Sequence, residues 1–296
     1  MIKGFVFSLF TAFLWSMIAV VFDRAAKKNL KLYSFYTCGM ILGTALSLFF
    51  VDWNVLLRGR IERLPELIVI ITVSGIANSV SMLLMIKAMK YGHSSLVWAL
   101  AQSAVVVQFV FATVFWGESI NLLQVLGLFS VFLALALTAS GAANQPGGQS
   151  GNPGKQFLLV LGCFCLIGLS QILFSAPSHW QNWSDNAGLR VPILYVSSCI
   201  LMVILSARAG ERMDKSTALI GLVLAVSGVI GARALLAGLD SLMPFNLSKI
   251  VYPIAISGSV VLFSLYSFII LKEPFTPKKL LGVALGTGGI IMLSLK

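Results

Sequence analysis

The chain has 296 residues, of which 58% are hydrophobic and only 10% are charged. Soluble domains carry roughly 25% charged residues, so this composition excludes a water-soluble fold and predicts an integral, multi-pass membrane protein. The net charge of +11 comes from lysines and arginines that fall mainly between apolar runs, as in loops that face anionic lipid headgroups. No basic stripe indicates nucleic-acid binding.

Ten apolar runs follow one another along the chain, and a helix needs about 20 such residues to cross a bilayer. Because a lipid-exposed segment must satisfy its own backbone hydrogen bonds, each run predicts a helix. The expected fold class is therefore an all-α membrane protein with ten transmembrane helices. The runs cover residues 4–22, 32–51, 67–89, 94–115, 121–140, 156–176, 190–207, 217–236, 245–270 and 276–295.

The chain has an internal repeat. The turns Gly117-Glu118 and Lys272-Glu273 place their glutamates 155 residues apart, and each is followed by Leu-Gly in the next apolar run. A pattern that recurs at about half the chain length indicates a duplication. Because five helices are an odd number, the second copy must enter the membrane from the opposite side, which predicts two inverted five-helix repeats around a shared cavity.

The middle of the chain is rich in glycine, proline and amide residues, a composition typical of a flexible linker. We therefore divide the chain into a first five-helix repeat at 1–140, a linker at 141–155 and a second repeat at 156–296.

Loop charges predict the orientation, because cytoplasmic loops carry more lysine and arginine. Twelve cations follow the odd-numbered helices and six lie on the opposite side, which predicts that both termini lie outside the cytoplasm. The first group is Arg24, Lys27, Lys28, Lys31, Lys90, Lys155, Arg208, Arg212, Lys215, Lys272, Lys278 and Lys279; the second is Lys3, Arg58, Arg60, Arg63, Arg190 and Lys296.

Three stretches carry a resemblance to a known family: the opening helix with Leu14-Trp15-Ser16 and its exit Asp23-Arg24-Ala25-Ala26-Lys27, the two Glu turns, and Tyr252-Pro253-Ile-Ala-Ile-Ser257-Gly258. With these features the chain resembles the drug/metabolite transporter superfamily, and within it the EamA-like ten-helix transporters. The resemblance implies a secondary transporter in a bacterial-type plasma (inner) membrane. The small members of this superfamily couple transport to a membrane-embedded glutamate. Here Glu118 and Glu273 lie at helix ends, so that role is not carried over.

Lys249 and Pro253 form the sharpest pair of candidate residues. Proline has no amide hydrogen, so the carbonyl of Lys249 would lose its helical partner, and a helix break beside a cation suits a polar cavity. The alternative is that the helix begins later and Lys249 reaches the headgroups. Arg233 could bind a substrate carboxylate, or it could pair with Asp240 at the interface.

Further candidate substrate-binding residues are neutral. Asn78 belongs to a polar face with Ser74, Ser79 and Ser81, which could contact substrate or join helices by hydrogen bonds. Trp98 and Gln102 lie one helical turn apart and so share a face. Tyr252 and Trp15 are cavity aromatics by family likeness.

These residues predict a cavity lined by the first, third, fourth, sixth, eighth and ninth helices. Two cations in it favour a zwitterionic or anionic solute with a carboxylate, such as an amino acid, exported by alternating access. The alternatives are a lipid-carrier flippase, a multidrug exporter or a membrane enzyme. An enzyme is disfavoured because the two histidines, His93 and His179, form no HExxH motif and no GxSxG motif is present.

We expect no cofactor and no metal. ATP is excluded because Gly154-Lys155-Gln156 lacks the Ser/Thr of a P-loop. The expected partners are a small-molecule solute and membrane lipid. We expect a monomer rather than a dimer, because the small-residue face Gly282-x-x-x-Gly286 can be used for packing within the chain.

Overall fold

The computed structural model describes residues 2–28, 30–51, 53–54, 61–91, 94–116, 121–142, 153–180, 184–211, 215–242, 251–272 and 277–294. Almost all of them are helical. The elements are α1 (Ile2–Lys27), α2 (Leu32–Leu48), α4 (Leu64–Met89), α5 (Ser94–Gln102), α6 (Val105–Phe115), α7 (Leu122–Ala142), α8 (Pro153–Ser175), the 3₁₀ turn η1 (Ala176–His179), α9 (Ser184–Ala209), α10 (Lys215–Leu242), α11 (Val251–Ile269) and α12 (Pro277–Ser294).

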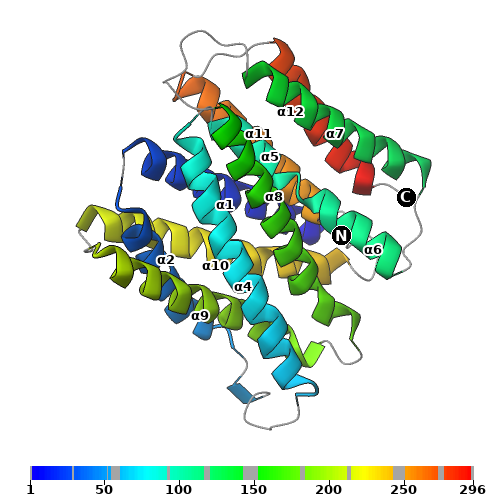
Figure 1. The fold of residues 1–296 in the computed structure, drawn as a ribbon. Coiled ribbons are helices and arrows are strands. Elements are labelled where there is room, and N and C mark those ends of the chain that lie inside the picture. Colours follow the sequence, from blue (N-terminus) through cyan, green and yellow to red (C-terminus); the bar gives the residue numbers. More distant parts are fainter. Residues whose placement is uncertain are drawn as a thin grey trace.

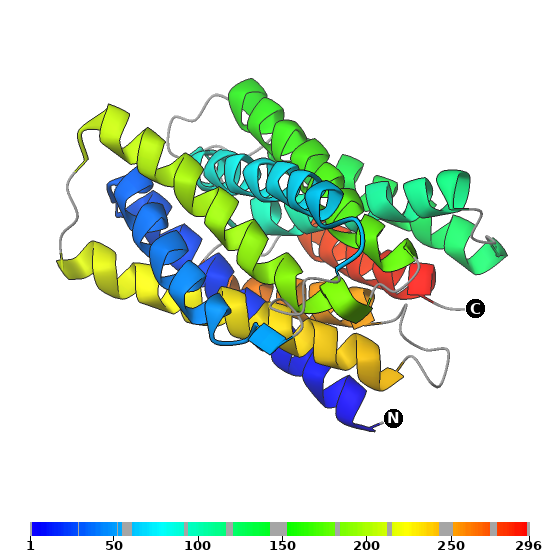
Figure 2. The ribbon, with the colours of Figure 1, turned by 90° about the horizontal axis from the view of Figure 1, so that it is seen from below.

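Within these ranges, six spans are long and apolar enough to cross a membrane, with α5 and α6 together forming one of them. Four shorter apolar helices lie in α2, α7, α11 and α12, so the apolar helices in the described residues number ten. The predicted all-α class and the number of helices are confirmed. Both chain ends lie at the same end of the bundle (Figure 2), as ten crossings require.

Several helices extend beyond the apolar runs that predicted them, among them α1 and α9, and this corrects the expected loops. α1 continues through Lys27 and α9 begins at Ser184, so Asp23 and Arg190 both lie inside helices. Apolar content defined the predicted ends, but a helix continues through charged residues when protein surrounds them.

The helices pack mainly between the two halves of the chain. α1 packs against α10 and α11, α4 against α8 and α9, and α2 against α9 and α10. α7 and α12 pair with each other along one edge of the bundle, at the upper right of Figure 1.

The side chains are distributed as a lipid environment demands. Large apolar side chains such as Phe13, Val69 and Phe129 are exposed on the outside of the bundle. Serines occupy the interior, because small residues let helices approach closely and their hydroxyls can join helices. At Gly75, an added Cβ would lie 2.7 Å from the Leu194 carbonyl oxygen, so α4 and α9 meet at this glycine.

Candidate functional site

A cavity of about 210 Å³ lies between the two halves of the chain. It is smaller than the roughly 300–1,000 Å³ typical of sites for drug-sized ligands, so it suits a solute of metabolite size. All six helices predicted to line a cavity contribute to it, and α2 and α9 contribute as well. The lining residues are Trp15, Ile18, Phe22, Tyr36, Met40, Asn78, Met82, Trp98, Gln102, Ile167, Ser170, Gln171, Phe174, Val191, Leu194, Tyr195, Leu224, Gly228, Ala232, Leu235 and Tyr252.

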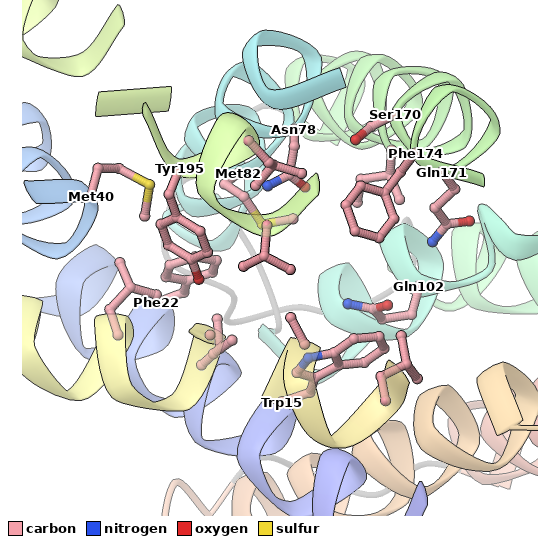
Figure 3. Close-up of a pocket in the computed structure, with 18 of the residues that line it drawn as sticks. Trp15, Phe22, Met40, Asn78, Met82, Gln102, Ser170, Gln171, Phe174 and Tyr195 are labelled. Carbon is pink, nitrogen blue, oxygen red and sulfur yellow. The ribbon is translucent and has the colours of Figure 1, made fainter. Parts of the chain in front are cut away.

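The cavity has a polar wall and an apolar wall. Figure 3 shows the amides of Gln102 and Gln171 on one side, with Met40 and Tyr195 on the opposite side. Two of the lining polar atoms, Trp98 Nε1 and Gln171 Oε1, are buried and have no hydrogen-bond partner within the described part of the chain. Because a buried polar group without a partner costs free energy, these atoms favour a ligand with its own donors and acceptors.

An interruption of the fourth span places Gln102 at the cavity. α5 ends at Gln102, and Ser103 and Ala104 form a turn before α6 begins. There the backbone N–H of Ala104 donates to the Ala101 carbonyl at 3.2 Å and that of Val106 donates to the Ser103 carbonyl at 3.0 Å. Interrupted helices in membrane proteins are tolerated where backbone lines a polar cavity.

Sequence reasoning also predicted a helix break at Lys249 and Pro253, and this stays a prediction. Pro253 lies in the first described turn of α11. Lys249 belongs to residues 243–250, outside the described residues, as do Glu118 and Glu273.

Five of the seven residues predicted to bind substrate are brought together at this cavity. They are Trp15, Asn78, Trp98, Gln102 and Tyr252. Of the serines near Asn78, Ser74 joins helices: its hydroxyl donates to the Ser170 carbonyl on α8 at 2.9 Å. One of the two uses predicted for this polar face, hydrogen bonding between helices, therefore occurs at Ser74, and substrate contact by Asn78 stays a prediction.

Arg233 does not line the cavity. Its guanidinium donates to the Phe50 carbonyl, just after the end of α2, and its Cζ lies 5.0 Å from the centre of the Phe50 ring. The last carbonyls of a helix lack intrahelical partners, so a cation there is favourable. Arg233 thus joins α10 to the end of α2.

Arg190 is a buried cation that sequence reasoning placed in a loop. Its side chain is only 3% exposed, although it lies near the start of a candidate membrane span. It precedes the lining residue Leu194 by one helical turn on α9, but it is not itself among the lining residues. The polar residues before the apolar run concealed this burial in the sequence.

A buried carboxylate lies at the other end of α1. Asp23 is 1% exposed, its Oδ1 lies 2.9 Å from Lys27 Nζ, and Ser94 Oγ on α5 donates to the same oxygen at 2.5 Å. This corrects the expectation that Asp23 belongs to the loop after the first helix. The hydrogen bond connects α1 to α5 where α1 ends and α5 begins, here called the Asp23 end.

The Asp23 end is tightly packed. Phe22 and Phe35 meet edge to face with ring centres 6.4 Å apart, and Phe35 and Tyr36 do so at 6.0 Å. Ala25, Val97 and other buried residues complete the same apolar cluster. Phe22 and Tyr36 also line the cavity, so this packed cluster forms the wall of the cavity that faces the Asp23 end.

Comparisons with known proteins bear on the fold and on the family. No curated protein matches this chain. A solved structure titled "Crystal structure of protein" aligns with a TM-score of 0.63 and 14% sequence identity, over 98% of this chain and 95% of that one, and this likeness concerns the fold alone. Residues 2–140 match the profile of the EamA-like transporter family. The first half of the chain is therefore similar to the EamA-like transporter family, as the resemblance in its sequence led us to expect.

Proposed function

We propose that this protein is a secondary active transporter that moves a small metabolite across the membrane by alternating access. The cavity between the two halves carries this proposal: it is contributed by helices of both halves and is packed shut at the Asp23 end. A central site that is closed on one side is what an alternating-access carrier needs.

The helix pairing supports two inverted repeats. If the halves are exchanged in order, α1 corresponds to α8, α2 to α9, α4 to α10, α5–α6 to α11, and α7 to α12. Under this exchange, the contact between α1 and α10 becomes the contact between α8 and α4. The contact between α2 and α10 becomes the contact between α9 and α4. All four of these contacts occur in the structure. The pairs α2–α9 and α7–α12 map onto themselves. A pseudo-two-fold axis accounts for this pattern.

The cavity supports an amphipathic solute. Its described lining residues are all neutral, with the amides of Gln102 and Gln171 on one side and Met40 and Tyr195 on the opposite side. An amino-acid-like zwitterion or small anion with an apolar side chain suits such walls. We propose export, from a cell with a bacterial-type inner membrane, and an energy source in an ion or solute gradient.

Counterflow into proteoliposomes tests the proposal. A panel of radiolabelled amino acids should exchange against the same unlabelled solute trapped inside, in vesicles that hold the protein and not in empty ones. The absence of counterflow for every zwitterion would contradict the proposed substrate class.

A matched pair of glutamine variants tests whether the transported solute binds in the cavity. Gln102 lines the cavity, whereas Gln108 lies outside its described lining and donates to Ser175 Oγ at 2.6 Å. Gln102→Leu should raise the half-saturating concentration about tenfold, because a hydrogen bond to a solute is lost. Gln108→Leu should leave it near the wild-type value. Equal effects of both substitutions on the half-saturating concentration would mean that the solute does not bind in this cavity.

A further inference from the structure

Gln171 on α8 faces the break between α5 and α6. Before it on α8, a Cβ added at Gly168 would lie 2.6 Å from Val107 Cβ, in the first turn of α6. After it, Ser175 Oγ accepts a hydrogen bond from Gln108 Nε2, also on α6, at 2.6 Å. Gly168, Gln171 and Ser175 follow one another at helical spacing and so share a face of α8. Because Gln171 also lines the cavity, its side chain lies where the cavity meets the break.

Two oxygen atoms at this place can accept hydrogen bonds from a ligand. Gln171 Oε1 is buried and has no hydrogen-bond partner within the described part of the chain. The second is the carbonyl oxygen of Gln102. In a continuous α-helix it would accept from the N–H of Val106, but here that N–H donates to the Ser103 carbonyl at 3.0 Å. The Gln102 carbonyl thus resembles the last carbonyls of a helix, which lack intrahelical donors and carry partial negative charge.

Oxygen atoms of this kind favour a small cation with several donors. In interrupted membrane helices, carbonyls at the end of a half-helix bind cations at the substrate site. The lining residues that the structure describes are all neutral, so none of them supplies such a cation. An amino-acid-like solute brings one in its ammonium group, which carries three N–H donors.

We infer that the ammonium group of the transported solute binds at the break after Gln102, with Gln171 Oε1 and the Gln102 carbonyl as its acceptors. This inference rests on the proposed function and names the residues that recognise the ammonium. The solute carboxylate then lies towards Trp98, one helical turn before Gln102 on the same face of α5. Trp98 Nε1 can only donate, and it has no hydrogen-bond partner among the described residues. Donor and acceptors at different positions along α5 thus orient the solute.

Two compounds of the same shape isolate the ammonium group. L-Leucine carries an ammonium where (S)-2-hydroxy-4-methylpentanoate carries a hydroxyl, and the two are otherwise identical. If another amino acid gives the strongest counterflow, that amino acid is paired with its own hydroxy acid. Binding to the purified full-length protein can be followed by intrinsic fluorescence, because Trp15 and Trp98 both line the cavity.

Wild-type protein should bind leucine more tightly than the hydroxy acid. Gln171→Met, which removes the acceptor, should weaken binding of leucine about 10- to 100-fold and binding of the hydroxy acid at most about threefold, because a hydroxyl donates only one uncharged hydrogen bond. Gln171→Glu keeps acceptor oxygens and should bind leucine at least as tightly as the wild type. Gln108→Leu is the matched control: it removes an amide that faces the same side of α8 but is bonded to Ser175, and it should keep the wild-type preference.

Three results would overturn the inference. The first is a wild-type protein that binds the hydroxy acid as tightly as leucine, and this result needs no variant to fold. The second is an equal loss of both compounds in Gln171→Met, which would indicate a structural role. The third is an equal loss of leucine binding in Gln171→Met and Gln171→Glu, which would mean that the Gln171 amide donates to the solute and does not accept from it.

Further measurements separate this inference from its neighbours. A fluorescence response to NaCl or KCl, absent with N-methyl-D-glucamine chloride and abolished in Gln171→Met, would assign these oxygens to an alkali ion and overturn the inference. If wild-type protein binds neither compound of the pair and moves no amino acid, the proposed substrate class fails, and the inference fails with it. Amino-acid counterflow that Gln171→Met leaves unchanged contradicts the inference alone.

Discussion

Ser74 and Ser170 exchange hydrogen bonds across the boundary between the two halves of the chain. Ser74 Oγ donates to the Ser170 carbonyl at 2.9 Å, and Ser170 Oγ donates to the Ser74 carbonyl at 3.0 Å. Both side chains are buried, and Ser170 also lines the cavity. The pair therefore fixes α4 against α8 beside the polar wall.

Replacing either serine by alanine should lower the free energy of unfolding by about 1 kcal/mol, and the two changes should not be additive. A double-mutant cycle measured by denaturation in detergent should give a coupling of about 0.5–1 kcal/mol. Ser8→Ala is the control, because among the described residues that hydroxyl bonds only within its own helix, to Gly4. Strictly additive losses of unfolding free energy at Ser74 and Ser170 would mean that the two serines stabilise the protein independently.

Tyr195 is held between two glycines of neighbouring helices. A Cβ at Gly43 on α2 would overlap the Tyr195 ring, and a Cβ at Gly228 on α10 would overlap its hydroxyl oxygen. Because the ring cannot move towards Gly43, Gly228→Ala should destabilise the protein by about 1–3 kcal/mol and disturb the cavity.

Removal of the Tyr195 hydroxyl should restore the stability that Gly228→Ala loses. In Tyr195→Phe/Gly228→Ala the nearest ring carbon at that site lies 3.5 Å from the added methyl, an ordinary contact. Thermal unfolding of the single and double variants tests this. Gly288→Ala is the control, since an added Cβ there meets nothing within 4 Å, and it should be neutral or stabilising. A double variant as unstable as Gly228→Ala alone would contradict the steric account.

The spans and the neutral cavity residues could be predicted from sequence because each rests on a local pattern. Length and continuous hydrophobicity locate α4 or α8, and one helical turn of spacing places Trp98 and Gln102 on a common face. The number of helices follows directly from such patterns.

The surroundings of the charged residues could not be predicted in the same way. Arg233 is half-buried and contacts the Phe50 carbonyl, whereas Arg190 is buried on α9. The surroundings of each arginine depend on residues distant in sequence, so neither hydropathy nor residue spacing distinguishes the two arginines. The break after Gln102 was missed for a related reason: it contains no proline or glycine, and only its backbone hydrogen bonds reveal it.

Arg233 should contribute to stability through the end of α2. Arg233→Met keeps much of the length of the side chain but removes the donor to the Phe50 carbonyl and the contact with the Phe50 ring. We expect a loss of about 1–2 kcal/mol in unfolding free energy, as for other cations at helix C-termini in partly buried sites. Binding of solute should change little. A large loss of solute affinity in a stably folded variant would instead place Arg233 in the site.

The bond between Asp23 and Ser94 should control opening of the Asp23 end. Alternating access requires this end to open, and α1 and α5 must then separate or move together. Asp23→Ala removes both the Ser94 hydrogen bond and the contact with Lys27. A loss of about 1–2 kcal/mol from the closed state would raise the open population roughly 5- to 30-fold where that population is small.

A cysteine in the packed cluster can report this change. Ala25 is 1% exposed, so Ala25→Cys, in a chain whose native cysteines are replaced, should react with a water-soluble maleimide only when the Asp23 end opens. Asp23→Ala should raise the labelling rate by the same factor as the open population. The control is Glu66→Ala, which breaks the exposed Arg63–Glu66 pair on α4 and should have no effect, because surface ion pairs contribute little. An unchanged labelling rate in a folded Asp23→Ala protein would mean that packing of Phe22, Phe35 and their neighbours holds this end closed without the carboxylate.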